Sequence, residues 1–333
     1  QVAKLVAAAQ GNPRSETLRA ELFDFVLVDE ASQMDVAHAL MAFTGLAEGA
    51  SVTVVGDDLQ MPPIHPVPPP KGLEAMVGSI YGFYRGHPRG AVDPVMLDVN
   101  YRSKEDIVGF VRSAGYRQEF RAHFRCQRLD LCTPLPSGED APAGWPAGLE
   151  WSPEWARLLD PAEPLVAVVH GDDTASQRNE AEAHAVAALV ATLWGRLGGL
   201  EHGPRELRGS GGPMPLRDFL SRGVGVVTPH RAQQAAVVDL LLRSLPPQDG
   251  HGLIFDAVDT VERFQGQERM VMIATLGLGD LDQIRLEEEF LYSLQRFNVI
   301  ASRAQAKLVV LVSRTLLDHI PGDSDMMRQS GMR

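Results

Sequence analysis

Cysteine and long apolar segments are scarce in this chain. Its 333 residues contain two cysteines, Cys126 and Cys132, whereas a zinc or iron–sulfur site needs a second pair at a suitable spacing. We therefore expect no metal centre built on cysteine, and a reducing intracellular location. No apolar run approaches the roughly 20 residues that span a bilayer, and no secretory signal follows Gln1. We expect no membrane segment, and because residue 1 is not Met we expect a piece of a longer protein.

Basic charge is also in short supply. The net charge of −12 argues against a surface that binds nucleic acid throughout, because phosphate binding depends on Lys and Arg. Between Arg102 and Arg128, however, seven basic residues stand against three acidic ones. This stretch is either a local contact with nucleic acid or the solvated face of a helix, and the sequence leaves both open.

Apolar runs of strand length alternate with helical patterns along the chain, which is typical of parallel α/β layers. The clearest helical patterns are Met76–Tyr84, Glu180–Leu193 and Gln233–Leu242. The expected strands are Asp24–Val28, Ser51–Gly56, Val95–Val99, Leu165–His170, Gly223–Thr228, Ile254–Val258, Val271–Thr275 and Leu308–Val312. The fold class that follows is α/β, with parallel sheets flanked by helices.

Proline and glycine divide the chain into parts. The segment Met61–Pro70 is rich in proline and cannot continue a helix or a central strand. We expect a domain boundary near Gly90–Pro94, because the length allows about two domains. The stretches 133–164 and 198–215 are rich in Pro and Gly, and we expect them to form surface insertions.

Acidic residues follow the first two expected strands. Asp29 and Glu30 come after one strand, and Asp57 comes after the next. Parallel strands deliver such residues to the same edge of a sheet, where ligands of doubly wound folds bind. Hydrolysis of a magnesium nucleotide needs one carboxylate for the metal and another to orient water. Gln60 follows closely and could sense the γ-phosphate.

Two arginines are candidates for phosphate contacts. Tyr101 stands beside Arg102, so an aromatic ring could stack on adenine while the guanidinium binds phosphate; a turn with a surface arginine is the alternative. Arg303 lies on an expected helix packed under a sheet, where an unpaired guanidinium would be costly. Either a phosphate or a carboxylate would relieve that cost.

The downstream strand ends carry further polar groups. Gly266 could permit close approach of the backbone and Glu268 could accept hydrogen bonds from a ribose, whereas a capped helix start would explain both equally well. Thr260 offers a hydroxyl and an amide to a nucleic-acid phosphate. Thr228 ends another expected strand. His230 is interpreted as a surface or capping histidine, and we expect no catalytic role for it.

With these residues in place, the chain resembles a superfamily 1 helicase, most closely the 1B group of RNA-decay and replication helicases. Six segments occur in the family's order, which is a specific signal. They are Asp29–Gln33 (DEASQ), Gly56–Pro63 (GDDLQMPP), Asn100–Ser103 (NYRS), Gly223–Gln234 (GVGVVTPHRAQQ), Val258–Glu268 (VDTVERFQGQE) and Phe297–Gln305 (FNVIASRAQ). The resemblance implies tandem RecA-like domains, the first incomplete at residues 1–94 and the second at 95–333, with ATP and Mg²⁺ as cofactors.

The resemblance also implies a role for individual residues, each carried over by its motif. For the nucleotide these are Asp29 for Mg²⁺, Glu30 for water activation, Gln60 as γ-phosphate sensor, Tyr101 for adenine, Arg102 and Arg303 as arginine fingers, and Gly266 and Glu268 beside the ribose. For nucleic acid they are Pro62, Thr228, Pro229 and Thr260. The implied activity is ATP-driven movement on single-stranded DNA or RNA, in the 5′ to 3′ direction that DEASQ favours.

One motif of the family is missing. The P-loop G-x-x-x-x-G-K-[ST] occurs nowhere in the 333 residues, so we expect this part alone to be inactive as an ATPase. A preceding segment or a protein partner would complete the first domain. The alternative is a non-hydrolysing module that binds nucleic acid or protein, although the joint presence of Glu30, Arg102, Glu268 and Arg303 favours the enzyme.

Overall fold

The computed structural model describes residues 21–63, 70, 72–86, 93–142, 145 and 149–323. The chain divides into two compact units, Gln1–Met96 and Leu97–Arg333. Most of the proline-rich segment, at 64–69, and part of the expected boundary Gly90–Pro94 lie outside the described residues.

The first unit is built on two parallel strands. Strand β1 (Phe23–Val28) pairs with β2 (Leu46–Val54), which confirms both expected strands, although β2 begins five residues earlier than predicted. Helix α2 (Val36–Phe43) connects the two strands, and the expected helical stretch at Met76–Tyr84 forms two short helices, α3 (Glu74–Val77) and α4 (Ile80–Gly86). Small apolar side chains of β1, α2 and α4 form the core of this unit.

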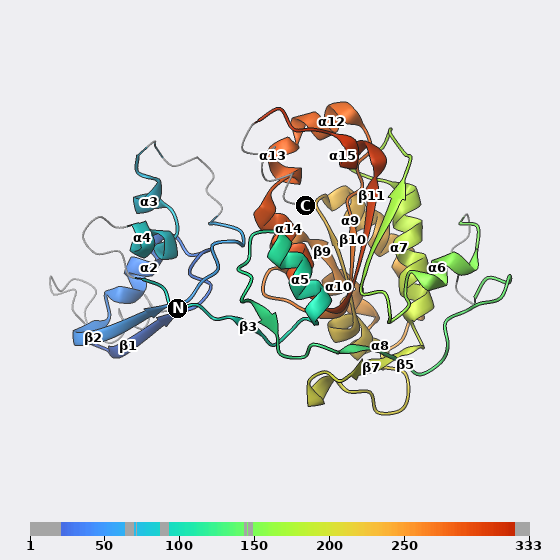
Figure 1. The fold of residues 1–333 in the computed structure, drawn as a ribbon, viewed down its shortest axis with the longest axis horizontal. Helices are drawn as coiled ribbons and strands as arrows, with labels where there is room; N and C mark the ends of the chain where they lie inside the picture. Colours follow the sequence, from blue (N-terminus) through green and yellow to red (C-terminus); the bar gives the residue numbers. More distant parts are fainter. Residues whose placement is uncertain are drawn as a thin grey trace. The chain divides into compact units, whose positions relative to one another are not determined.

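The second unit contains a five-stranded parallel sheet with strand order β6-β11-β10-β8-β9 (Figure 1). This sheet, flanked by helices, confirms the expected α/β class. Its strands are β6 (Leu165–His170), β8 (Val224–Thr228), β9 (Val258–Thr260), β10 (Arg269–Thr275) and β11 (Ala304–Ser313). Strands β8 and β10 are buried along their whole length, as expected when helices cover both faces of a parallel sheet.

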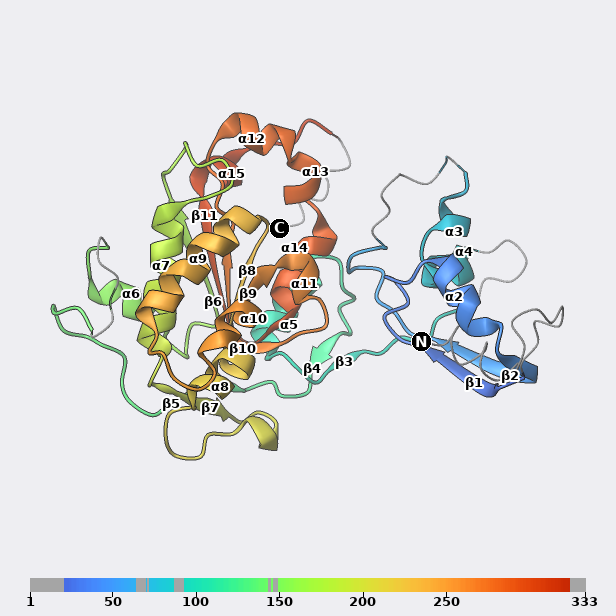
Figure 2. The same cartoon turned by 180° about the vertical axis from the view of Figure 1, so that it is seen from behind.

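Helices lie on the two faces of this sheet (Figure 1 and Figure 2). Helices α7 (Glu180–Leu193) and α9 (Arg231–Ser244) pack on one face, and α5 (Glu105–Ser113) and α14 (Leu294–Ser302) lie on the other. The remaining helices are α6 (Pro153–Arg157), α8 (Leu216–Asp218), α10 (Ile254–Ala257), α11 (Val261–Phe264), α12 (Leu281–Leu286), α13 (Glu288–Leu291) and α15 (Arg314–Asp318).

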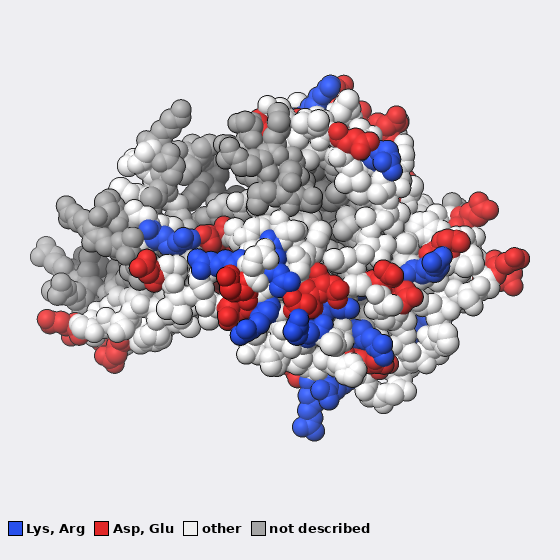
Figure 3. All heavy atoms as spheres, in the orientation of Figure 1, with Lys and Arg blue, Asp and Glu red and all other residues white. Residues whose placement is uncertain are grey.

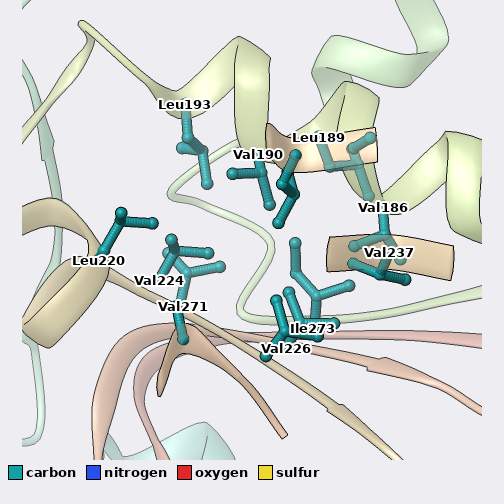
Figure 4. Packing of buried hydrophobic residues seen from close by; sticks show 14 of the residues in the cluster. Val186, Leu189, Val190, Leu193, Leu220, Val224, Val226, Val237, Val271 and Ile273 are labelled. Carbon is teal, nitrogen blue, oxygen red and sulfur yellow. The ribbon is translucent and has the colours of Figure 1, made fainter. Parts of the chain in front are cut away.

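The main core lies between the sheet and helices α7 and α9 (Figure 4). Val226 and Ile273 point from neighbouring strands toward Val186 and Leu189 of α7, and Val237 adds an apolar side chain from α9. Alternate strand residues face this core because successive side chains of a strand point to opposite faces. The predicted helix Glu180–Leu193 is confirmed at both ends.

Two expected strands are wrong. Of Val95–Val99 only the last residue is in a strand, β3 (Val99–Asn100), which pairs with β4 (Arg121–Ala122). Val95 is 92% exposed, so the start of this apolar run does not pack in a sheet. Ile254–Val258 is mostly helix α10, because Ile254 and Ala257, three residues apart, share the buried face while Phe255 is exposed.

The irregular stretches contain more structure than expected. Strand β7 (Leu197–Glu201) pairs antiparallel with β5 (Arg128–Leu131), and the sequence analysis found neither strand. Both cysteines are free thiols, and the described residues contain no cluster of His, Cys, Asp and Glu able to hold a metal by itself. No helix in the described ranges is long and apolar enough to cross a membrane.

Candidate nucleotide and nucleic-acid sites

Asp29, Glu30 and Asp57 of the first unit lie at one edge of the two-stranded sheet, as the sequence predicted. Asp29 and Glu30 directly follow β1, and Asp57 follows β2. Two hydrogen bonds join the loops: Ala31 N donates to Val55 O at 2.8 Å, and Asp57 N donates to Ser32 Oγ at 3.3 Å. The carboxylates of Asp29, Glu30 and Asp57 therefore lie on two adjoining loops at this edge.

Glu30 has an unusual backbone conformation. Its φ of +50° lies in the left-handed region, which is uncommon for residues other than glycine and is concentrated at functional positions. Asp29 Oδ1 accepts from the Glu30 amide at 2.9 Å, and Gln33 Nε2 donates to Glu30 Oε2 at 2.9 Å. Both carboxylates are exposed, so a ligand can reach them.

Gln60 is tied to the same edge. Its Nε2 donates to Asp57 Oδ2 at 2.7 Å, while Asp57 Oδ1 accepts from the Leu59 amide at 3.0 Å. The Asp57 carboxylate thus holds both the turn and the amide side chain. Pro62 is exposed two residues further on.

In the second unit Arg102 and Glu268 form an ion pair. Arg102 Nε donates to Glu268 Oε2 at 2.6 Å, and Arg102 Nη1 donates to the Ser302 carbonyl at 3.1 Å. Gln305 Nε2 donates to the other oxygen of Glu268 at 3.1 Å. Residues from three separate motifs therefore meet, and Glu268 binds a guanidinium in this structure.

The loop that carries Arg102 is positioned by polar residues that the sequence analysis did not single out individually. Asn100 Oδ1 accepts from the amides of Arg102 and Ser103, both at 2.7 Å. Ser103 Oγ donates to Ala304 O at 2.7 Å, and Gln127 Nε2 donates to Gln305 O at 2.8 Å. An Asn two residues before the arginine is a turn signal, whereas the contacts with residues 304 and 305 depend on the tertiary fold.

Arg303 is almost completely buried, with 2% of its surface exposed. Its Nε donates to Val299 O at 3.2 Å, Nη1 to Gln267 O at 3.4 Å and Nη2 to Ser302 Oγ at 3.1 Å. From the sequence, a phosphate or a carboxylate was expected to offset the burial of this charge. Carbonyl and hydroxyl oxygens contribute that stabilisation here.

Tyr101 is exposed, whereas Gly266 has a backbone conformation that favours glycine. Tyr101 is 64% exposed and its ring lies 4.6 Å from that of His123, at an angle of 30°, so it is accessible for stacking. Gly266 has a φ of +82°, and a side-chain carbon there would meet no atom within 4 Å. The backbone angle favours glycine at this position, and the open space around it leaves room for the ligand approach that the sequence predicted.

Thr228 and Thr260 are register partners at the carboxyl ends of β8 and β9. Both are buried; Thr228 Oγ1 accepts from His230 N at 3.4 Å, and the Thr260 amide donates to Asp259 Oδ1 at 2.8 Å. Two residues separated by 32 positions thus lie side by side at the ligand-binding edge of the sheet.

A cavity of about 510 Å³ is lined in part by the two residues that follow Thr228 in the chain, and its volume is within the size range of ligand sites. It is lined by Pro229, His230, Leu286, Glu287, Glu289, Phe290 and Arg296. His230 occupies the N-cap position of α9, in line with the expected capping histidine, but its side chain makes no capping hydrogen bond and is only 10% exposed. The packing of residues 286–290 over the ring could not be read from the local sequence.

The basic stretch from Arg102 to Arg128 is neutralised by acidic neighbours. Arg112 Nη2 pairs with Glu105 at 2.9 Å and Arg128 Nε with Glu201 at 2.5 Å. Figure 3 shows basic and acidic side chains interspersed across the face that it presents. These pairs favour the solvated, ion-paired surface over a continuous basic patch.

Comparison with known proteins connects this arrangement to helicases. A family model described as an AAA domain (AAA_12), which is typical of superfamily 1 helicases, matches residues 82–315. The mouse DNA replication ATP-dependent helicase/nuclease DNA2 is 24% identical over 308 residues, which cover 90% of this chain and 25% of the mouse protein. The mouse RNA helicase Mov10l1 is 34% identical over 94 residues, or 27% of this chain and 7% of that protein.

The chain therefore spans a quarter or less of the length of these relatives. A solved structure described as the PRRSV helicase overlaps 86% of this chain and 34% of its own, with 13% identity and a TM-score of 0.36. That structural likeness is too weak to argue from. The family match and the curated relatives confirm the resemblance to the C-terminal part of a superfamily 1 helicase.

Proposed function

This chain belongs to the AAA domain family whose model matches residues 82–315, and on that premise we propose that it is part of an ATP-driven motor that moves 5′ to 3′ on single-stranded DNA or RNA. At the level of the family, a helicase-like function on nucleic acid is supported by the DNA2 and Mov10 relatives. The observation that carries the proposal is the meeting of Arg102, Glu268 and the Ser302–Arg303 turn at one place in the second unit.

The carboxylates of the first unit supply the groups that hydrolysis needs. Asp29 would hold Mg²⁺, whose remaining ligands are phosphate oxygens and water in sites of this kind; the bound ion would neutralise charge on the phosphates. Glu30 is exposed and tied at Oε2 to Gln33, so it can accept a proton from water. Gln60, held by Asp57 at 2.7 Å, would respond to the γ-phosphate through that hydrogen bond.

The second unit would supply cations and the adenosine contacts. Arg102 is 29% exposed at its side chain, so its guanidinium can exchange Glu268 for a phosphoryl group, which binds bidentately. That exchange would release Glu268 for ribose hydroxyls, next to Tyr101 for adenine. The Arg303 side chain is almost completely buried. Contact with a phosphate would therefore require the turn at Ser302 to shift.

The nucleic acid would cross the carboxyl edge of the sheet at Thr228, Pro229 and Thr260. The Thr260 hydroxyl at the start of α11 could contact a phosphate, and its amide could do so only after releasing Asp259 Oδ1. Pro229 lines an open cavity. Contacts of this kind are independent of sequence, as a translocating motor requires. The choice between DNA and RNA depends on contacts with the 2′-hydroxyl.

Steady-state ATP hydrolysis tests the proposal. The assay compares this chain with a version extended upstream to include a P-loop, with and without single-stranded DNA or RNA. We expect turnover only from the extended version, stimulated by one of the two polymers. Absence of ATP turnover in both versions would contradict the proposed motor function.

A second candidate function has one observation in its favour. Arg102 and Arg303 are both bonded within the chain, to Glu268 and to carbonyl and hydroxyl oxygens, so neither requires a nucleotide for stability. A module that binds nucleic acid without hydrolysis would keep these bonds. Binding of single strands by this chain, together with an inactive extended version, would favour the module.

A further inference from the structure

The carboxylate of Glu268 is held at each oxygen by a different residue. Oε2 accepts from Arg102 Nε at 2.6 Å, and Oε1 accepts from Gln305 Nε2 at 3.1 Å. An ionised carboxylate has about four lone-pair sites on its two oxygens, so these two bonds leave acceptor capacity for further donors. The side chain of Glu268 is 46% exposed, so a ligand can reach it.

Gln305 is placed beside Glu268 by two neighbouring parallel strands. Glu268 directly precedes β10, and Gln305 is the second residue of β11. The register pairs Arg269 with Ala304 where these strands begin. The contact between the two side chains therefore follows from the pairing of β10 with β11, and it connects two of the motifs found in the sequence.

The backbone of Gln305 is fixed more firmly than the side chain of Arg102. The Gln305 carbonyl oxygen accepts from the Lys104 amide at 2.9 Å and from Gln127 Nε2 at 2.8 Å. Gln305 is 3% exposed and Gln127 is fully buried, whereas the Arg102 side chain is 29% exposed. When a phosphoryl group takes Arg102 away, as the proposed function requires, Glu268 therefore keeps its bond to Gln305.

The donor of Gln305 is a neutral amide, and this has a chemical consequence. A cationic side chain would form a charge-assisted bond, about twice as strong as a neutral one, and would offset the charge of the carboxylate. The amide orients Oε1 and leaves the negative charge of Glu268 in place. The oxygen that Arg102 releases is then a strong acceptor for hydroxyl groups, and a ribose carries two adjacent ones.

We propose that Gln305 is a positioning residue, which holds the Glu268 carboxylate in the orientation that accepts from the 2′- and 3′-hydroxyls of the nucleotide once Arg102 has left it. The inference rests on the proposed function and deepens it, because it makes the ribose hydroxyls a requirement for tight binding of the nucleotide. Gln305 itself contacts neither the ribose nor the reacting phosphate. Its effect should therefore appear in KM rather than in kcat, and only for nucleotides that carry these hydroxyls.

Steady-state hydrolysis by the extended version tests this role with two substrates, at a saturating concentration of the single strand that stimulates it. ATP carries both hydroxyls, and 2′,3′-dideoxy-ATP carries neither. We expect the KM of wild type for dideoxy-ATP to be about tenfold higher than its KM for ATP, because a hydrogen bond to a charged group contributes at least this much. The two kcat values should agree within about twofold, since neither hydroxyl takes part in phosphoryl transfer.

Two variants remove the donor. Gln305→Met keeps an unbranched side chain of the same length, and Gln305→Glu keeps the shape and places an acceptor against Glu268. Both should raise the KM for ATP most of the way to the dideoxy-ATP value, while the KM for dideoxy-ATP and both kcat values stay within about twofold of wild type. Gln177→Met is the matched control, because Gln177 Nε2 donates to a carboxylate oxygen of Glu287 at 2.9 Å and has no proposed role. It should keep the wild-type preference for ATP.

The outcomes separate the inference from the function on which it rests. Equal KM values of wild type for the two substrates would overturn the positioning role while leaving the motor intact. An ATP preference that survives in a Gln305 variant with a cooperative melting curve would overturn it as well, and so would a KM that rises equally for both substrates, which indicates a general structural effect. Absence of hydrolysis by the wild-type extended version would instead overturn the proposed function, and the inference with it.

Discussion

Arg102 donates to Glu268 at 2.6 Å although 166 residues separate them in the chain. Each of the two has a proposed nucleotide contact, phosphate for the arginine and ribose for the glutamate, so the ion pair occupies both groups until a nucleotide replaces it. The side chains are 29% and 46% exposed, and ion pairs at such positions are weak. A nucleotide can therefore break this one at little cost.

Arg102→Ala is expected to abolish nucleic-acid-stimulated ATP hydrolysis in the extended version. Loss of an arginine finger lowers kcat by roughly 10³ to 10⁵, whereas the affinity for single strands should stay within about threefold because Thr228 and Thr260 are untouched. Arg128→Ala is the control, since Arg128 forms a comparable ion pair with Glu201 at 2.5 Å and has no proposed role. Hydrolysis at the wild-type rate by Arg102→Ala would contradict the assignment.

Arg303 requires a milder substitution, because its buried guanidinium donates to two carbonyls and a hydroxyl. Replacement by alanine would remove the donors that Arg303 supplies to those oxygens and destabilise the fold. Arg303→Lys keeps the charge and loses the forked geometry, and we expect the melting temperature to fall while hydrolysis decreases by at least a hundredfold. If the variant has the reduced melting temperature but hydrolyses ATP at the full rate, the role of Arg303 is purely structural.

Thr228 and Thr260 should act together on nucleic acid. Their position as register partners predicts that Thr228→Val and Thr260→Val each raise the dissociation constant for a single strand several-fold. Fluorescence anisotropy with a labelled dT strand measures this. Thr192→Val is the matched control: its hydroxyl is equally buried and donates to Ala188 O at 2.8 Å within α7. If the control weakens binding as much as the other two, the effect is one of stability.

Long apolar strands and the motif order could be predicted from the sequence, whereas the type of a short apolar element and the contacts between distant residues could not. The runs that became β8, β10 and β11 are apolar enough to be buried in any α/β sheet, but Ile254–Val258 is apolar too and forms helix α10 because its buried residues are three apart. Asp29, Glu30 and Asp57 were placed at one edge by the general behaviour of parallel strands. The burial of His230 depends on Glu287 and Phe290, which lie more than fifty residues away in the sequence.

His170 is expected to contribute stability that disappears as the pH rises. Its Nε2 lies 2.8 Å from the buried carboxyl group of Glu182, and the hydrogen bond with Glu182, against the opposing effect of burial, raises the pKa of His170. A raised pKa in the folded state means that the contribution is complete below the unfolded value of about 6.5. It is lost as the pH rises through the folded pKa.

Urea unfolding between pH 5 and 8.5 measures this contribution. His170→Asn should lower the free energy of unfolding at pH 5.5 more than at pH 8. His184→Asn is the control, because His184 is half-buried and contacts the carbonyl of Glu180; it should leave the wild-type profile unchanged. Parallel profiles for wild type and His170→Asn would refute the proposed pH dependence.

Lys307 is expected to have the opposite effect, at higher pH. It is 1% exposed in β11, and its Nζ donates to Asp160 O at 2.9 Å and to Glu163 O. Burial lowers the pKa of Lys307 to about 8, below the ordinary value of about 10.4. Between these two values the unfolded chain binds more protons than the folded one, so the free energy of unfolding should rise with pH, by roughly 3 kcal/mol at most.

Lys307→Met removes the titrating group while keeping a long unbranched side chain. The rise in the free energy of unfolding between pH 7.5 and 10 should be smaller in this variant than in wild type, because the remaining groups titrate in both. Lys104→Met is the control, since Lys104 pairs with Asp106 at 3.2 Å and only lowers the pKa of Lys307 further. It should keep most of the rise. An equal rise in Lys307→Met would mean that this amine titrates normally, and that its two carbonyl partners offset the cost of its burial.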